Sequence, residues 1–212
     1  MMKNYILLLA LTFATGAYCQ NPYQGVTVVS ADGITFEVDF RWNGFLLSNT
    51  ANIYAGEANW RYKDGRELET EDEYAVIDGS MKPGVENLAL RKSLPDSVIL
   101  SLRSYKYSPM TIFYVIGPDG DTLEVSFIMN AVPELLSLPP ETFALLEHNL
   151  KKYVKWEVNK YGQQLEFMQT SSFVHFQKVP LNSEVPPRNP NIGGGLDSNF
   201  DTDLGGDYEG VR

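Results

Sequence analysis

Acidic side chains are the residues of this 212-residue chain whose chemistry could support catalysis. Glycoside hydrolysis uses two carboxyl groups, one as a general acid and the other as a base or nucleophile. Segments that the pattern predicts to be strands carry five candidates: Glu37, Asp39, Glu124, Glu157 and Glu166. All alternate with apolar residues, as the polar residues of a solvated sheet face also do, and spacing alone does not shift a pKa. The pattern favours a non-catalytic protein and leaves a carboxylate-dependent glycan hydrolase as the alternative.

Other residue types that commonly carry chemistry are few and scattered. His148 falls on a predicted helix and His175 on a predicted terminal strand, without metal-ligand or triad-like spacing around either. Gly193–Gly195 are not flanked by a strand and a helix, as a phosphate-binding loop would be. The acidic run Glu67–Glu73 and four aspartates near the C-terminus match no complete calcium-loop pattern: Asp197, Asp201, Asp203 and Asp207. We therefore predict no catalytic residue, no metal site and no cofactor, and leave the binding residues open.

Aromatic residues cluster near predicted strand ends and turns. They are Trp42, Trp60, Tyr62, Tyr105, Tyr107, Trp156 and Tyr161. Rings in such places can form a face that binds a sugar or a protein, and they also close the rim of a hydrophobic core.

The N-terminus resembles a secretory signal. Lys3 precedes the apolar run Ile6–Phe13, and Ala17-Tyr18-Cys19 fits a small-residue cleavage site that would leave Gln20 as the new terminus. The alternative is lipidation of Cys19, although Tyr18 stands where a lipoprotein signal prefers a small residue. We expect an exported protein, periplasmic or outer-membrane-associated if Cys19 is lipidated, with no transmembrane segment after signal cleavage.

The formal net charge of −10 limits the partners. Nucleic-acid binding requires a basic surface, so we expect no nucleic-acid partner. A protein, or an envelope or glycan partner, is compatible with an acidic surface.

The stretch Met110–Met129 is the clearest structural signal. Two apolar runs flank Gly117-Pro118-Asp119-Gly120-Asp121, and Asp-Gly supplies the positive φ of a tight turn. The first run, Thr111–Ile116, is apolar on both faces, as a central strand would be. In the second run, alternation predicts four residues on one face and three on the other: Leu123, Val125, Phe127 and Met129 against Thr122, Glu124 and Ser126.

Further elements follow from the same reasoning. Val26–Ser30 and Ile34–Trp42 predict a hairpin across Asp32-Gly33, whereas Leu46–Glu57 is ambiguous. Helices are predicted within Asn87–Tyr105 and over Pro139–Tyr153, where Phe143, Leu146, Leu150 and Tyr153 make a buried stripe. The remaining predicted strands are Ala58–Tyr62, Val154–Val158, Leu165–Met168 and Phe173–Phe176.

These elements predict an α+β fold, with a mostly antiparallel sheet and two helices packed on one face. We divide the chain into a signal peptide (1–19), a β-rich N-terminal region (20–82), an α+β domain (83–179) and a C-terminal tail (180–212). The tail is rich in Pro, Gly, Asn and Asp and is expected to be disordered, because it cannot bury enough apolar surface.

Residues from Leu88 to about Lys178 resemble the C-terminal domain of TonB-type energy transducers. The shared order is a helix with an early proline at Leu94-Pro95, strands flanking Asp119-Gly120, a second helix, Trp156, a turn at Gly162, and a closing strand at Leu165–Phe167. Trp156 is followed by Glu157, where that family usually has proline. The whole chain also looks similar to secreted bacterial proteins without an assigned activity. The resemblance implies a fold, and a binding module of the bacterial envelope is the function that fits it.

Overall fold

The computed structural model describes residues 21–41, 43–57, 59–68, 77–82 and 84–184. The proposed signal peptide, Cys19, Trp42 and residues 69–73 of the acidic run lie outside these residues. So does most of the C-terminal tail.

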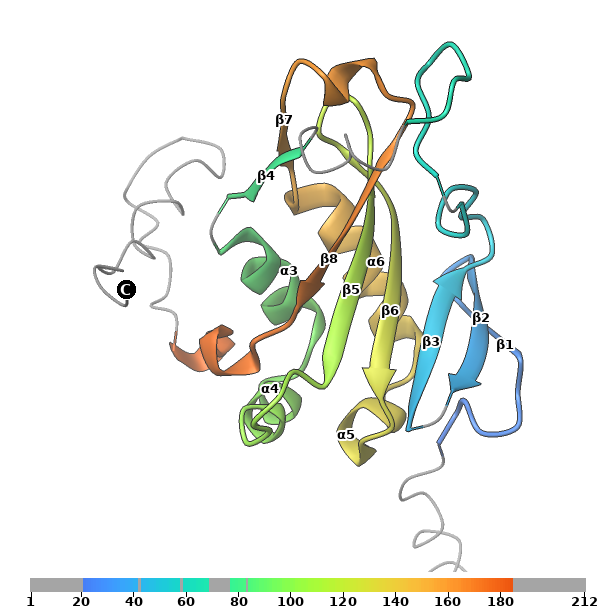
Figure 1. Ribbon diagram of the computed structural model, residues 1–212. Helices are drawn as coiled ribbons and strands as arrows, with labels where there is room; N and C mark the ends of the chain where they lie inside the picture. The colour runs from blue at the N-terminus through green and yellow to red at the C-terminus, as the bar shows by residue number, and fades with distance from the viewer. Residues whose placement is uncertain (1–20, 42, 58, 69–76, 83, 185–212) are drawn as a thin grey trace, which may run out of the picture.

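A six-stranded antiparallel sheet organises the fold (Figure 1). Its strands occur in the order β1-β2-β3-β6-β5-β8. Their bounds are β1 Val28–Ala31, β2 Ile34–Arg41, β3 Gly44–Asn49, β5 Met110–Ile116, β6 Thr122–Asn130 and β8 Met168–Phe173. The predicted α+β class with a mostly antiparallel sheet is confirmed.

The ladder between β3 and β6 joins the N-terminal β-rich region to the rest of the chain. Gly44 pairs with Asn130, and the register runs on to Ser48 opposite Ser126. The segment Leu46–Glu57, which the sequence left ambiguous, is therefore a strand up to Asn49 and a loop after it.

Both predicted Asp-Gly hairpins form. Asp32 and Gly33 have φ values of 52° and 79°, as the turn between β1 and β2 requires. In the turn between β5 and β6, Gly120 has a φ of 85°. A Cβ on Gly120 would lie 2.1 Å from the carbonyl oxygen of Trp156, so this turn also needs glycine for close packing.

A β-bulge changes the predicted alternation of β6. Ile116 pairs with Thr122 and Val115 with Glu124, which leaves Leu123 without an opposite residue. Leu123 is consequently exposed, while Thr122 is buried and its hydroxyl donates to the carbonyl oxygen of Val154. The predicted inward position of Leu123 is wrong, because one extra residue reverses the alternation at the start of the strand.

Helices cover one face of the sheet. They are α3 Val85–Ser93, α4 Asp96–Leu102, α5 Pro133–Leu136 and α6 Pro140–Tyr153. Pro95 separates α3 from α4 inside the predicted helical stretch and stands at the N-cap of α4. Helix α6 packs on α3 and on the sheet, behind β6 in Figure 1.

The core lies between the sheet and these helices. Phe36, Leu47 and Phe127 point toward the helices from three neighbouring strands and are completely buried. The rings of Phe127 and Phe143 lie 5.6 Å apart, which joins β6 to α6. The predicted burial of Val125 and Phe127 on the helix face, together with Phe143, Leu146 and Leu150, is confirmed.

The C-terminal strands differ from the prediction. Strand β7 (Trp156–Val158) pairs with β4 (Ile77–Met81) in a separate two-stranded sheet. Strand β8 begins at Met168 and pairs with β5, while Leu165 makes only an isolated bridge to Tyr62. The predicted strand Phe173–Phe176 is also wrong, since β8 ends at Phe173 and Phe176 begins a 3-10 helix. Strand partners depend on contacts distant in sequence, so a local pattern does not identify them.

The first residues after position 180 pack against the helices. Asn182–Glu184 form a 3-10 helix, and the Asn182 backbone N–H donates to Asp96 at 2.9 Å. The Arg103 guanidinium donates to Glu184 at 2.8 Å, and this hydrogen bond lowers the Glu184 pKa to about 2. The part of the proposed tail that the structure describes is therefore attached to the fold.

Replacing Phe127 with alanine is expected to cost about 3–5 kcal/mol of unfolding free energy, because it leaves a cavity against α6. Urea denaturation measures this cost. The matched control is Ile128→Ala on the adjacent residue, which points to the opposite face and is 44% exposed. A cost for Phe127→Ala no larger than for the control would contradict the assigned core.

Candidate functional site

Glu124 anchors a loop over the face of the sheet that the helices leave open. Its Oε1 accepts hydrogen bonds from the backbone N–H groups of Ile53 (2.6 Å) and Tyr54 (3.1 Å). Its Oε2 accepts from Tyr54 (3.1 Å) and Ala55 (2.9 Å). Three successive N–H groups thus converge on one carboxylate, which is only 6% exposed. The sequence placed Glu124 on a solvated face, and that placement is wrong because the loop covers it.

Two side-chain amides fasten the same loop at other points. Asn52 Nδ2 donates to the carbonyl oxygen of Val125 at 3.0 Å and approaches the Ser126 hydroxyl at 3.4 Å. Gln169 Nε2 donates to the carbonyl oxygen of Tyr54 at 2.7 Å. The loop is therefore held to β6 at one end and to β8 at the other.

An aromatic and ionic cluster supports the outer side of the loop. The Tyr54 ring stacks on Phe167 at 4.5 Å, and the Tyr54 hydroxyl donates to Glu166 at 3.0 Å. Arg61 forms an ion pair with the same carboxylate. The hydrogen bond from Arg61, followed by that from Tyr54, lowers the pKa of Glu166. Glu166 thus has a structural role in this arrangement.

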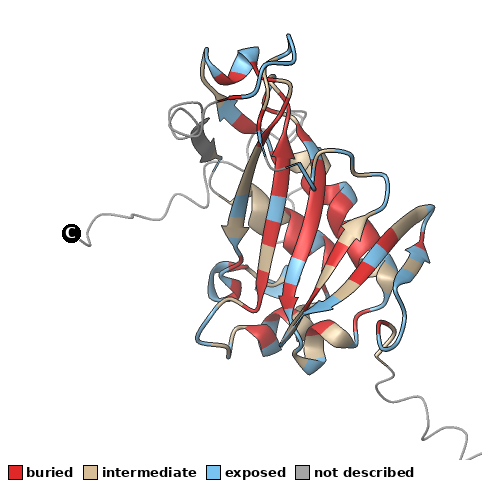
Figure 2. Cartoon of the chain, turned by 45° about the vertical axis from the view of Figure 1, so that its right-hand side comes forward, coloured by how far each residue is buried: buried red, intermediate tan, exposed pale blue. Residues whose placement is uncertain are grey.

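A hollow of about 440 Å³ lies between the loop and the open sheet face. Loop residues Thr50, Asn52, Ala55 and Gly56 bound it, and β2, β3, β5, β6 and β8 provide the rest of its lining. Figure 2 turns the sheet forward and shows exposed and half-buried residues among the buried ones. The volume is within the usual range for small-ligand sites, about 300–1,000 Å³.

The strand register explains which side chains reach the hollow. Leu46, Ile128 and Thr111 occupy one row across β3, β6 and β5. Ser48, Ser126 and Phe113 form the next row, and the two serine hydroxyls lie 3.0 Å apart. Phe113 is 41% exposed, although the sequence predicted a strand buried on both faces. The open side of the sheet is therefore partly apolar and accessible.

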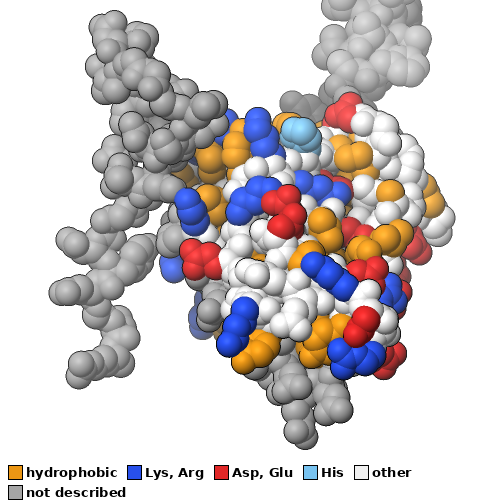
Figure 3. All heavy atoms as spheres, turned by 90° about the horizontal axis from the view of Figure 1, so that it is seen from above, with side chains coloured by type: hydrophobic (Ala, Val, Ile, Leu, Met, Phe, Trp, Pro, Cys, Tyr) orange, Lys and Arg blue, Asp and Glu red, His pale blue; other side chains and the backbone are white. Residues whose placement is uncertain are grey.

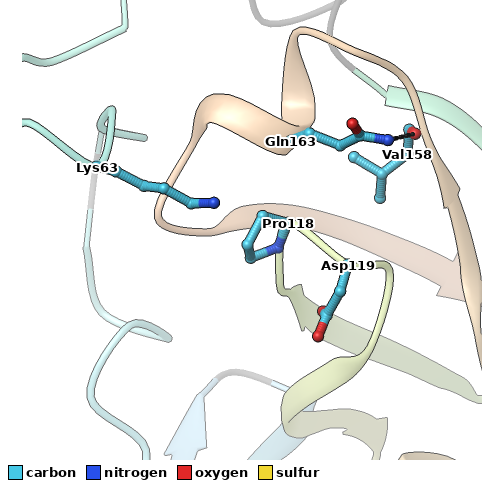
Figure 4. A pocket seen from close by; sticks show the side chains of 5 residues that line it. All are labelled: Lys63, Pro118, Asp119, Val158 and Gln163. Carbon is cyan, nitrogen blue, oxygen red and sulfur yellow. Dashed lines mark hydrogen bonds between the residues drawn. The ribbon is translucent and has the colours of Figure 1, made fainter.

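A second depression of about 380 Å³ lies at another end of the molecule. Lys63, Pro118, Asp119, Val158 and Gln163 line it, and in Figure 4 the Lys63 side chain extends toward Pro118. Gln163 Nε2 donates to the carbonyl oxygen of Val158 at 3.2 Å. Figure 3 views the molecule from above, where basic and acidic side chains alternate with apolar ones. The polar groups that line this second depression support a turn and a strand end. The depression is therefore the weaker candidate for a functional site.

The candidate carboxylates are not gathered into one reactive pair. Glu37 and Glu124 both line the hollow, but both oxygens of Glu124 are engaged by the loop. Asp39 forms an ion pair with Arg41. Glu157 lies on β7 and Glu166 binds Arg61, and neither lines the hollow.

The histidines lie apart from the hollow. His148 is exposed on α6, and His175 is exposed beside a 3-10 helix. Within the described residues, no group of three His, Cys, Asp or Glu side chains is arranged to hold a metal ion.

Those of the predicted aromatic residues that the structure describes, all except Trp42, differ widely in exposure and do not form one common face. Trp60 and Trp156 are buried, and Trp156 packs edge-on against Tyr114 while its Nε1 donates to Thr122 at 3.2 Å. Tyr107 and Tyr161 are 74% and 54% exposed. Tyr62 and Tyr105 are half-buried.

Sequence reasoning missed Asn52, Phe113, Ile128 and Gln169 as lining residues of the hollow. The outward positions of Phe113 and Ile128 follow from strand alternation. Asn52 and Gln169 carry no sequence signal of this kind, because the loop brings them together across more than half of the chain.

Comparison with known proteins gives a fold but no activity. No protein-family model matches the chain, and no curated protein matches it. A solved structure of a DUF5043 family protein from Bacteroides uniformis ATCC 8492 is similar, with a TM-score of 0.59 and 19% sequence identity. The similarity covers 74% of this chain and 95% of that protein. The resemblance to TonB-type proteins remains a prediction.

Helix α3 carries a half-buried acid, Glu86. It accepts hydrogen bonds from the Tyr114 hydroxyl at 2.7 Å and the Ser172 hydroxyl at 3.0 Å. Burial raises the pKa of Glu86 and outweighs these hydrogen bonds, which act in the opposite direction. Burial also raises the pKa of Tyr114 well above its usual value.

The raised pKa of Glu86 predicts a pH-dependent stability. The folded protein holds this proton more tightly than the unfolded chain, so stability falls as pH rises from the usual glutamate value through the folded pKa. Glu86→Gln should remove this loss, and its stability relative to wild type should increase with pH. Urea denaturation from about pH 4 to pH 7 tests this. The control is Glu141→Gln, an exposed glutamate in the first turn of α6. A difference that stays flat or shrinks with pH would refute the prediction.

Glu124→Gln should loosen the loop, because the new NH₂ group would face a backbone N–H in place of an acceptor. We expect the free energy of unfolding to fall by about 1–3 kcal/mol. Hydrogen exchange of the Ile53, Tyr54 and Ala55 amides should also become faster. Glu37→Gln, on the same sheet face and exposed, is the matched control. Unchanged exchange in the Glu124 variant would show that the carboxylate does not hold the loop.

Proposed function

We propose that this chain is an exported, non-catalytic binding module that captures an extended segment of an envelope or secreted partner on the free edge of β8. The observation that supports this most directly is the position of β8 at the end of the sheet. Among the residues that the structure describes, β5 is the only strand paired with it. At the other end, β1 is four residues long and α6 lies beside it.

The hydrogen-bond register identifies the groups that a partner would meet. The Val174 N–H donates to the carbonyl oxygen of Met110, which makes these two residues a hydrogen-bonded pair at the end of the β5–β8 ladder. Such pairs alternate along an antiparallel ladder, so the backbone groups of Gln169, Ser171 and Phe173 point away from β5. An added strand could bind to these three residues.

The composition of β8 also suits capture of another strand. Its sequence, MQTSSF, contains no charge and no proline. Sheet edges are commonly protected by charged residues, proline or bulges, and an edge without such protection readily accepts another strand. Ser171 is exposed and Phe173 is 64% exposed, so the edge is accessible. Recognition would rest mainly on backbone hydrogen bonds and would tolerate varied partner sequences.

The glycan hydrolase alternative has less support. It requires two carboxyl groups free to act on one bond. The hollow holds Glu37 and Glu124, and the hydrogen bonds of Glu124 to the loop occupy both of its oxygens. No helix in the described part of the chain is both long and apolar enough to cross a membrane, and the proposal does not require one.

Proline at position 171 is the sharpest test, because it removes a backbone donor that points away from β5. Peptides would be selected from a displayed random library with the wild-type protein. Their affinities would then be measured for Ser171→Pro and for the control Ser171→Ala, which keeps the donor. We expect the proline variant to lose binding and the alanine variant to keep it.

Circular dichroism should be unchanged in both variants, since proline is tolerated at the outward positions of edge strands. A melting temperature within about 4 °C of wild type would show that the fold survives. A library that yields only peptides insensitive to Ser171→Pro would contradict capture at this edge.

A further inference from the structure

The hollow between the loop and the open sheet face carries charge of one sign only. Its charged lining residues are Glu37 and Glu124, and no lysine or arginine of the described segments lines it. The whole chain has a formal net charge of −10 as well. A carboxylate or phosphate ligand would therefore enter an unfavourable field, whereas a cation would be attracted.

Two of the side-chain amides that line the hollow, Asn52 and Gln169, use their hydrogen-bond donors to hold the loop. Asn52 Nδ2 faces the Val125 carbonyl oxygen and the Ser126 hydroxyl. Gln169 Nε2 faces the carbonyl oxygens of Tyr54 (2.7 Å) and Glu57 (3.4 Å). A primary amide has two N–H donors, so neither residue has a donor left for a ligand.

The acceptors remain available. The structure shows no hydrogen bond within its described residues to Asn52 Oδ1, Gln169 Oε1 or the Glu37 carboxylate. An ammonium group has three donors and no acceptor, and it matches a site that offers acceptors. A neutral hydroxyl could make similar hydrogen bonds, but it would gain nothing from the negative charge of the lining.

Apolar side chains complete the lining. Leu46 is half-buried, Phe113 is 41% exposed and Ile128 is 44% exposed. They can cover the hydrocarbon part of a ligand, and an aromatic ring such as that of Phe113 also attracts a cation. The ligand should accordingly combine a positive charge with an apolar body.

We propose that the hollow binds a primary ammonium group carried on an apolar stem. A free organic amine and the side chain of a lysine residue share this chemistry. The proposal is independent of strand capture at the β8 edge, because it rests on the side chains that line the hollow.

Three probes of similar shape test the charge preference. Isothermal titration calorimetry on the mature full-length chain would compare 2-phenylethylamine, 2-phenylethanol and phenylacetate. We expect saturable binding of the amine, weaker binding of the alcohol and none of phenylacetate. A fourth ligand, Nα-acetyl-lysine N-methylamide, represents a lysine residue. If it binds more tightly than 2-phenylethylamine, the ammonium group that the hollow recognises belongs to a lysine side chain.

Two substitutions test the location. Ile128→Trp should fill the hollow and abolish amine binding, and a thermal melt establishes whether the fold is intact. Glu37→Gln should weaken binding roughly two- to fivefold, as expected for an exposed charge pair. Asp39→Asn is the matched control for Glu37→Gln, because Asp39 is an acid on the same strand, outside the hollow and paired with Arg41. We expect it to leave amine affinity unchanged.

Clear outcomes would overturn the proposal. The first is the absence of saturable amine binding, and the second is binding of phenylacetate as tight as that of the amine. The third is an equal effect of Glu37→Gln and Asp39→Asn on amine affinity. Retained affinity in a folded Ile128→Trp variant would also overturn it. Ser171→Pro should leave amine binding intact, so failure of strand capture and failure of the ammonium site can be told apart.

Discussion

The convergence of three backbone N–H groups on Glu124 is the interaction on which the open side of this structure depends. The loop after β3 has no strand or helix of its own, so its backbone donors need partners outside regular structure. A carboxylate is well suited to this because it offers about four acceptor positions and forms charge-assisted hydrogen bonds. Since Glu124 lies near the start of β6, the loop is held over that end of the open face and the hollow forms beneath it.

The two faces of the sheet consequently differ in construction. The helix face is closed by aromatic and aliphatic packing, as the contact between Phe127 and Phe143 illustrates. On the open face, a polar loop covers one end and leaves apolar side chains such as Phe113 and Ile128 partly exposed. Side chains alternate along a strand, so adjacent residues of β6 serve these two environments: Phe127 stabilises the core while Ile128 faces the hollow.

Local patterns in the sequence predicted much of the fold. Asp32-Gly33 and Asp119-Gly120 specify turns through backbone conformations that glycine adopts easily, and apolar spacing located α6. The bulge at Leu123 was not predictable from alternation, because it depends on how β5 and β6 pair. Non-local contacts also determine the partners of β7 and β8. Glu124 shows the same limit at the candidate site: strand alternation placed it on the open face but gave no sign of the loop that buries it.

The two proposed sites meet at Gln169, and this contact has a thermodynamic consequence. The backbone groups of Gln169 point to the free edge of β8, while its side chain holds the carbonyl oxygen of Tyr54 in the loop. A strand added to β8 would fix the backbone from which that side chain extends, and a ligand in the hollow would order the loop that the side chain grips. If strand binding and ligand binding each restrict the motion of Gln169, then each changes the affinity of the protein for the other partner. The factor is the same in both directions, because linkage between two binding equilibria is reciprocal. If the side chain is already fully ordered by its hydrogen bonds, the factor is one and the two sites act independently. The strength of the hydrogen bond between Gln169 and Tyr54 in the unliganded protein thus determines whether the edge and the hollow work as one site or two.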